Sequence, residues 1–153
     1  MKRSYDELTN ELKMKNIRLS HQRLKVLEYL TMHLDHPTVD QIHTALQMEI
    51  PTLSKTTVYS TLNALVDAGI VRSINIEDNE TRYDIRVEDH GHFKCESCGT
   101  IYDFTADIDS LTTGDLNHFD IKDKNLYFKG CCPSCLPGRT NAPLRNKPFR
   151  SLT

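Results

Sequence analysis

Two Cys-x-x-Cys pairs constrain the fold of this chain more than any other feature. The first pair is Cys95 with Cys98, and the second is Cys132 with Cys135. Four thiolates in two such pairs typically close on one Zn²⁺ in a saturated tetrahedral site, which stabilises the fold and leaves no position open for chemistry. Two redox-active dithiols are the weaker alternative, because two pairs at this spacing normally bind a single ion. A fifth thiol, Cys131, adjoins Cys132 and has no role that the sequence identifies.

A second group of candidate metal ligands lies near the first cysteine pair. His90 and His92 are separated by one residue, so on an extended segment their side chains point the same way. Asp103, Asp84 and His36 offer further donors. Nitrogen and carboxylate ligands without a thiol favour Fe²⁺ or Mn²⁺, whereas Zn²⁺ prefers the cysteines. Taken singly, each of these residues is also compatible with a purely structural role.

Composition and charge narrow the class of protein. The chain has 153 residues, of which 38% are hydrophobic and 26% charged, as in ordinary globular proteins. A net charge of −2 and a pI near 6.4 argue against a protein that coats nucleic acid by bulk electrostatics, but not against local DNA contacts. Neither a signal peptide nor an apolar run of about 18 residues is present, so we expect a cytoplasmic protein without a membrane partner. In that compartment paired cysteines are typically metal ligands.

The first half of the chain has the periodicity of a winged helix-turn-helix. Apolar residues at three- and four-residue spacing predict helices over 5–17, from Ser20 to His36-Pro37, from Thr38 or Asp40 to Pro51, and over 54–67. Gly69 follows where a left-handed C-terminal cap is favoured. Strands are predicted over 70–76 and 81–87, joined by a polar turn. Three helices followed by a two-stranded ribbon are typical of this DNA-binding fold.

The second half predicts a small α/β unit. Strands are expected over 92–94, 100–104, 119–121 and 125–129, with a weak helix over 106–117. A unit of this size needs a staple, which zinc would supply, and its exposed strand edges indicate dimerisation. We therefore predict an α+β protein. A DNA-binding domain would cover residues 1–87 with a hinge to about 90, a zinc-binding dimerisation domain would cover 91–136, and 137–153 would form a flexible basic tail.

Six segments together resemble the ferric uptake regulator family, and within it the peroxide-responsive repressors. They cover residues 17–23, 36–38, 54–59, 90–99, 101–104 and 126–132. The resemblance implies structural zinc on Cys95, Cys98, Cys132 and Cys135, and a regulatory Fe²⁺ or Mn²⁺ site formed by His36, Asp84, His90, His92 and Asp103. Aspartate at position 103 is typical of the peroxide-responsive members, whereas iron sensors commonly have glutamate. A further metal site of the family is not expected, because Gly91 and Lys124 replace its usual ligands.

The resemblance also implies a function. It indicates a metal-dependent repressor that binds a palindromic double-stranded operator as a homodimer and senses hydrogen peroxide through iron-catalysed oxidation of His36 or His90. The residues expected to contact DNA are Arg18, Lys55, Thr56, Tyr59 and Ser60. Judged by helix propensity alone, the polar face of the fourth helix is equally compatible with simple exposure to solvent.

Three alternatives stay open at this point. The chain is also compatible with a repressor that responds to iron or manganese levels; a zinc-responsive repressor is less favoured because no additional cysteine or histidine cluster is present. A non-haem iron enzyme is disfavoured, because three histidines and two aspartates leave little room for both substrate and oxygen, so we expect no enzymatic activity. A zinc-stapled interaction module, with incidental histidines, is the third alternative.

Overall fold

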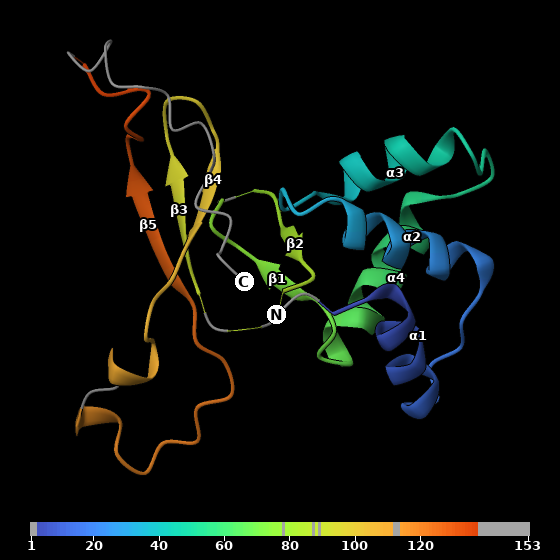
Figure 1. The fold of residues 1–153 in the computed structure, drawn as a ribbon, viewed down its shortest axis with the longest axis horizontal. Coiled ribbons are helices and arrows are strands. Elements are labelled where there is room, and N and C mark those ends of the chain that lie inside the picture. Colours follow the sequence, from blue (N-terminus) through green and yellow to red (C-terminus); the bar gives the residue numbers. More distant parts are fainter. Residues whose placement is uncertain (1–2, 78, 87, 89, 112–113, 138–153) are drawn as a thin grey trace. The chain divides into compact units, whose positions relative to one another are not determined.

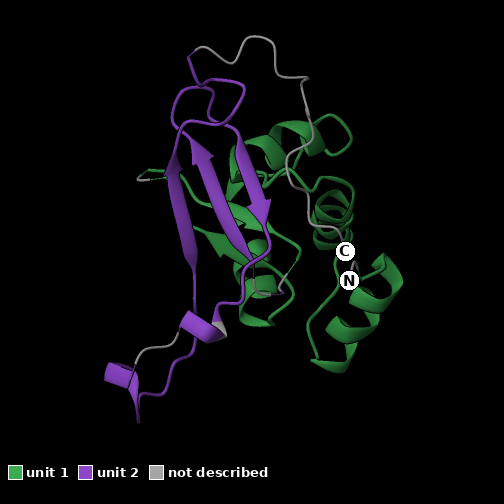
Figure 2. Ribbon diagram, turned by 60° about the vertical axis from the view of Figure 1, so that its left-hand side comes forward, with its two compact units in different colours: residues 1–87 green, residues 88–153 purple. Residues whose placement is uncertain are grey.

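A computed structural model describes residues 3–77, 79–86, 88, 90–111 and 114–137 (Figure 1). The chain divides into two compact units, Met1–Val87 and Glu88–Thr153 (Figure 2). The predicted basic tail over 137–153 falls outside the described residues, apart from Pro137. No helix in the described ranges is long and apolar enough to span a bilayer.

Unit 1 begins with four helices, α1 (Tyr5–Met14), α2 (His21–Met32), α3 (Val39–Gln47) and α4 (Lys55–Asp67). Each helix starts behind a hydroxyl side chain that accepts a hydrogen bond from a first-turn amide; these caps are Ser4, Ser20, Thr38 and Ser54. Gly69 has a φ of 71° after α4, as predicted. Helix α1 ends before Ile17 because Asn16 already adopts a left-handed conformation, with a φ of 55°.

The helices of unit 1 enclose one apolar core. Leu8, Leu27, Ile42 and Leu62, one from each helix, are fully buried in it. Strands β1 (Arg72–Ile74) and β2 (Arg82–Asp84) pair antiparallel as the wing and are shorter than predicted. The three helices α2, α3 and α4, followed by the two-stranded ribbon, confirm the predicted winged helix-turn-helix, and α1 precedes it.

Unit 2 contains a three-stranded sheet of strands β3 (Gly91–Cys95), β4 (Ile101–Phe104) and β5 (Leu126–Gly130). The strand order is β4-β3-β5, with β3 antiparallel to β4 and parallel to β5 (Figure 1). Because side chains alternate between the two faces of a sheet, His92, Asp103 and Tyr127 share one face at one register position. The sheet therefore brings together two predicted ligands from separate strands.

The segment between β4 and β5 differs from the sequence-based expectation. The helix predicted over 106–117 is wrong: the described residues form two short 3-10 helices, η1 (Asp109–Leu111) and η2 (Gly114–Leu116), while residues 112–113 lie outside the description. Two threonines followed by glycine have low helix propensity, and this outweighs the apolar periodicity. The strand predicted over 119–121 is also wrong. Phe119 donates to the Leu116 carbonyl directly after His118, whose φ is 68°, so the chain turns there.

Gly91 is required by the packing of the sheet. It pairs with Phe104 on β4, whose ring stacks on Phe128 of β5 with centroids 5.0 Å apart. A Cβ atom at position 91 would lie 2.1 Å from the Phe104 Cζ atom. The Phe104 ring must therefore leave its stack before any side chain can enter.

Replacing Gly91 with alanine is expected to lower the free energy of unfolding by about 1–3 kcal/mol, because overpacking displaces the Phe104 ring. Thermal unfolding of the zinc-loaded protein measures the change. Gly114→Ala is the matched control, since a Cβ there meets no atom within 4 Å. Equal destabilisation by the two substitutions would contradict the packing argument.

Candidate metal centres

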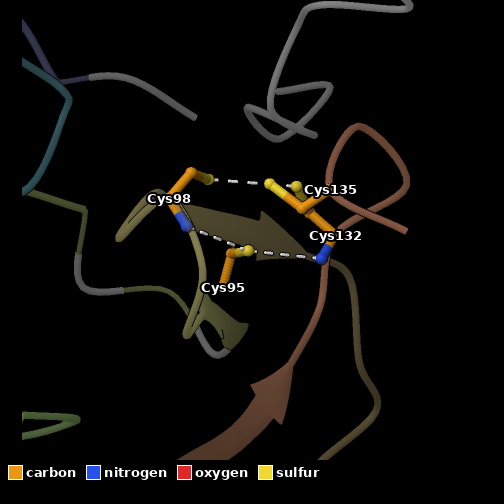
Figure 3. A group of neighbouring side chains, drawn as sticks. All are labelled: Cys95, Cys98, Cys132 and Cys135. Carbon is orange, nitrogen blue, oxygen red and sulfur yellow. Dashed lines mark hydrogen bonds between the residues drawn. The ribbon is translucent and has the colours of Figure 1, made fainter. Parts of the chain in front are cut away.

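The four cysteines of the two pairs converge in unit 2 (Figure 3). Their sulfur atoms all lie within 4.8 Å of one another. Strand β3 ends at Cys95, and the parallel strand β5 leads directly to Cys132, so both pairs reach the same end of the sheet. Cys98 Sγ lies 3.9 Å from Cys132 Sγ. Zinc–sulfur bonds of about 2.3 Å in a tetrahedron require roughly this spacing, so the cluster fits Zn²⁺.

Hydrogen bonds within the cluster shift the pKa values of its thiols in opposite directions. The backbone N–H groups of Cys132 and Cys98 donate to Cys95 Sγ over 3.3 and 3.5 Å, and these bonds lower the pKa of Cys95 to about 6. A hydrogen bond from the Tyr102 hydroxyl lowers the pKa of Cys132 and raises that of the phenol. A hydrogen bond with Cys132 raises the pKa of Cys135 to about 12. Cys95 is therefore the thiol most readily held as thiolate, the form that binds zinc, whereas Cys135 would lose its proton on binding a metal.

Cys131 is not a member of this cluster. Its sulfur lies 3.9 Å from Ser97 Oγ and 3.7 Å from the carbonyl oxygen of Cys132. The adjacent cysteines thus differ in environment: Cys132 is buried, and Cys131 is partly exposed. This difference makes the pair a natural comparison for substitution.

The sheet of unit 2 also gathers three of the predicted nitrogen and oxygen ligands. The Nε2 atoms of His90 and His92 lie 3.7 and 3.3 Å from Asp103 Oδ1. The Nδ1 atom of His90 lies 2.6 Å from the Glu88 carbonyl oxygen, to which it donates, so Nε2 is the nitrogen left to bind a metal. All three candidate ligands are buried. Two imidazoles and a carboxylate in this arrangement suit Fe²⁺ or Mn²⁺.

The other two predicted ligands meet in unit 1. His36 Nε2 lies 3.5 Å from Asp84 Oδ2, and both side chains are buried. The second carboxylate oxygen, Oδ1, accepts a hydrogen bond from the Arg86 backbone over 2.9 Å and lies 3.4 Å from Arg86 Nε. His36 lies beyond the end of α2, directly before Pro37, and its φ is 58°. The histidine is thus presented by a left-handed turn of the chain.

The predicted DNA contacts of helix α4 lie on its exposed face. Lys55, Thr56, Tyr59 and Ser60 are exposed, whereas Val58 and other apolar residues face the core. Lys55 forms an ion pair of 2.8 Å with Asp40 on α3. The lysine is therefore already engaged by a carboxylate, with which a DNA phosphate would compete.

Arg18 lies apart from the exposed face of α4 that carries Tyr59. It is exposed between α1 and α2, in a depression that it lines with Lys15, Arg23 and the C-terminal end of α4. Tyr59 instead borders a hollow that carries the acids Asp40, Glu77 and Glu80. The five predicted DNA contacts thus lie in two places, Arg18 in one and the four residues of α4 in the other. Only the surroundings of Arg18 are predominantly basic.

Three residues that contact the candidate ligands were missed by the sequence analysis. Tyr102 bonds the Cys132 sulfur, Arg86 bonds the Asp84 carboxylate, and Arg82 donates to the His36 carbonyl oxygen. Each lies within two residues of a predicted ligand aspartate, at position 103 or 84. That proximity was the available signal, because metal ligands are normally held by neighbouring hydrogen-bonding groups.

Comparison with known proteins identifies the family. The family model described as the ferric uptake regulator family matches residues 14–129. The chain belongs to the ferric uptake regulator family. The resemblance inferred from the motifs is thereby confirmed. The protein is a metal-responsive repressor of this family.

Individual relatives of this ferric uptake regulator family member include a peroxide-responsive repressor. PerR of Staphylococcus aureus strain Mu50 is 33% identical over 134 residues, which cover 85% of this chain and 90% of the relative. A solved structure of PerR from Streptococcus pyogenes is 31% identical, with a TM-score of 0.52, and the match covers 86% of this chain and 92% of the other. The Helicobacter pylori ferric uptake regulator Fur is 20% identical with a TM-score of 0.70, over 88% and 95% of the two chains, and supports the fold alone.

Proposed function

We propose that this protein is a peroxide-sensing, metal-dependent repressor that binds a palindromic DNA operator as a homodimer in the cytoplasm. The observation that carries the proposal is the buried Asp103 carboxylate, which lies within 3.7 Å of the Nε2 atoms of both His90 and His92. The identity to the S. aureus peroxide-responsive repressor supports it independently.

Two ions complete the proposal. The four clustered thiols would hold Zn²⁺ and stabilise unit 2. One Fe²⁺ or Mn²⁺ would be held by five ligands from both units, namely His36, Asp84, His90, His92 and Asp103. All of these donors are nitrogen or carboxylate oxygen, and they match what either ion prefers. Because both units contribute, metal occupancy would bias the hinge predicted to reach about residue 90, and so change the affinity for DNA.

The peroxide response would take place on this chain's own imidazoles. Bound Fe²⁺ would catalyse the transfer of electrons from the ring to peroxide, which Mn²⁺ would not. A ring carbon of His36 or His90 would gain one oxygen atom from hydrogen peroxide, and the hydrogen of that C–H would stay on the ring, on the new oxygen or on a ring nitrogen. The other peroxide oxygen would leave as water, so the ring is oxidised by two electrons and peroxide is reduced by two. A ligand altered in this way would bind the metal poorly, so the repressor would release DNA.

Helix α4 would enter the major groove. Tyr59, Ser60 and Thr56 are exposed on it and would reach base edges, while Lys55 would exchange Asp40 for a phosphate. Arg18, in its basic depression, would contact the DNA separately, toward the minor groove.

Peptide mass spectrometry of the metal-loaded protein after a low dose of peroxide tests the proposal. We expect one added oxygen on the peptide that contains His36 or His90 in the Fe²⁺-loaded protein. The Mn²⁺-loaded protein, treated identically, should show none. The comparison isolates the iron-dependent chemistry, because only the regulatory metal differs between the samples.

Other outcomes select different functions. Intact histidines and intact cysteines in both samples would favour a repressor that responds to the level of iron or manganese. Oxidation confined to the cysteines would instead identify the thiols, including Cys131, as the responsive groups. Either result would refute peroxide sensing through histidine.

A further inference from the structure

Arg82 connects the wing of unit 1 to the turn that presents His36. Its guanidinium Nη1 donates to the His36 carbonyl oxygen over 3.1 Å, and its Nε atom bonds the Glu77 carboxylate. We propose that Arg82 is a positioning residue for the regulatory metal, acting through the backbone of His36. This inference rests on the proposed function, in which His36 is a ligand.

The conformation of His36 requires such a restraint. Its φ of 58° lies in the left-handed region, which residues other than glycine rarely occupy. Such a conformation persists only where surrounding contacts hold it. Here strand β2 supplies them: the Tyr83 N–H donates to the Pro37 carbonyl over 3.0 Å, Thr38 forms a β-bridge with Arg82, and the Arg82 side chain closes on the His36 carbonyl. Arg82 makes the only side-chain bond among these contacts, and it reaches the ligand residue itself.

Glu77 fixes the orientation of the guanidinium. It lies in the turn between β1 and β2, and its side chain is 14% exposed, against 18% for Arg82. A guanidinium is a planar fork, so a carboxylate bound on one branch determines where the other branch points. The second candidate ligand, Asp84, follows two residues later on the same strand, with Oδ2 3.5 Å from His36 Nε2. Arg82 therefore controls the position of the histidine relative to its partner carboxylate.

A purely structural role is the competing explanation, and unit 1 contains a matched control for it. Arg3 also holds one glutamate and one backbone carbonyl: its Nη1 lies 2.9 Å from Glu11 Oε2, and its Nη2 donates to the Ile70 carbonyl over 3.0 Å. Arg3→Gln thus removes the same kinds of contact as Arg82→Gln, but neither Glu11 nor Ile70 is a candidate ligand. A difference between the two variants in metal binding reports positioning and not stability.

The test compares Mn²⁺ affinity, by calorimetry on the zinc-loaded full chain, with the thermal midpoint measured without Mn²⁺. We expect Arg82→Gln to bind Mn²⁺ about tenfold more weakly, since residues that orient ligands typically contribute 10- to 100-fold. Arg3→Gln should keep the wild-type affinity while losing a similar amount of thermal stability. Glu77→Gln retains the Arg82 bond to His36, so its loss of affinity should be smaller than that of Arg82→Gln.

Wild-type affinity in Arg82→Gln, or an equal loss in Arg3→Gln, would overturn the inference. His36→Ala separates this failure from failure of the proposed function. If His36→Ala weakens binding while Arg82→Gln does not, only the role of Arg82 is refuted. If wild-type protein and His36→Ala bind Mn²⁺ alike, His36 is not a ligand, and both the ligand assignment and the inference about Arg82 are refuted. Should Arg82→Gln not fold, Glu77→Gln decides: weakened binding supports positioning, and unchanged binding refutes it.

Discussion

Replacing Cys132 with serine is expected to abolish zinc binding and to unfold the sheet of unit 2. The Cys132 sulfur lies within the four-thiol cluster, and its backbone N–H bonds the Cys95 sulfur. Structural zinc contributes about 10–16 kcal/mol of binding energy in small zinc domains, so loss of one ligand should lower the stability of unit 2 by on the order of 5 kcal/mol. A three-stranded sheet of this size has little else to hold it.

Cys131→Ser is the control for that substitution, because it alters the adjacent thiol, which lies outside the cluster. We expect it to retain one zinc ion per chain and the wild-type unfolding profile. Native mass spectrometry gives the zinc stoichiometry, and circular dichroism during heating gives the stability. Zinc loss in Cys131→Ser together with zinc retention in Cys132→Ser would show that the adjacent thiol is the true ligand.

Asp103→Glu is expected to slow iron-dependent histidine oxidation about tenfold while changing Mn²⁺ affinity by less than about threefold. The Asp103 side chain is fully buried and lies close to two histidines. One additional methylene displaces the carboxylate without removing it. Binding tolerates such a shift, whereas a reaction that depends on the placement of a ring beside an oxidant is far more sensitive to displacements of about 1 Å.

Two measurements check this expectation on the same preparations. The rate at which the histidine peptides gain oxygen is followed by mass spectrometry in the Fe²⁺-loaded protein, and Mn²⁺ affinity is measured by calorimetry. Asp120→Glu, an exposed aspartate paired with Lys122, controls for the substitution itself. Oxidation of Asp103→Glu at the wild-type rate would count against peroxide sensing through this site.

Local signals in the sequence predicted the DNA-binding unit well. Hydroxyl caps, apolar spacing and Gly69 determine helices through contacts a few residues apart, so the amino-acid sequence alone is sufficient to locate them. The wing strands were predicted to be longer than the structure shows, because the ends of a strand depend on pairing with its neighbour. The zinc cluster was predictable for a different reason: thiol chemistry identifies the residues regardless of how the chain reaches them.

Long-range contacts explain what the sequence did not reveal. The bond between Arg82 and the His36 carbonyl joins positions far apart in the chain, and no spacing rule encodes it. The stack of Phe104 on Phe128 over Gly91 arises only from strand register. The region between β4 and β5 was misjudged because apolar periodicity favoured a helix, while threonine and glycine propensities opposed it.

The parallel pairing of β3 with β5 also determines when unit 2 can fold during synthesis. Parallel neighbours cannot form a hairpin, so the pair of β3 and β4 must wait for β5, which begins at Leu126, well after β3 ends at Cys95. Unit 1 is fully encoded by Val87 and is able to fold as the ribosome continues. Until Cys132 and Cys135 emerge, Cys95 and Cys98 can offer a metal ion only half of the four-thiol cluster. A nascent chain therefore passes through an interval in which its DNA-binding half is complete and its cysteines are exposed to oxidants.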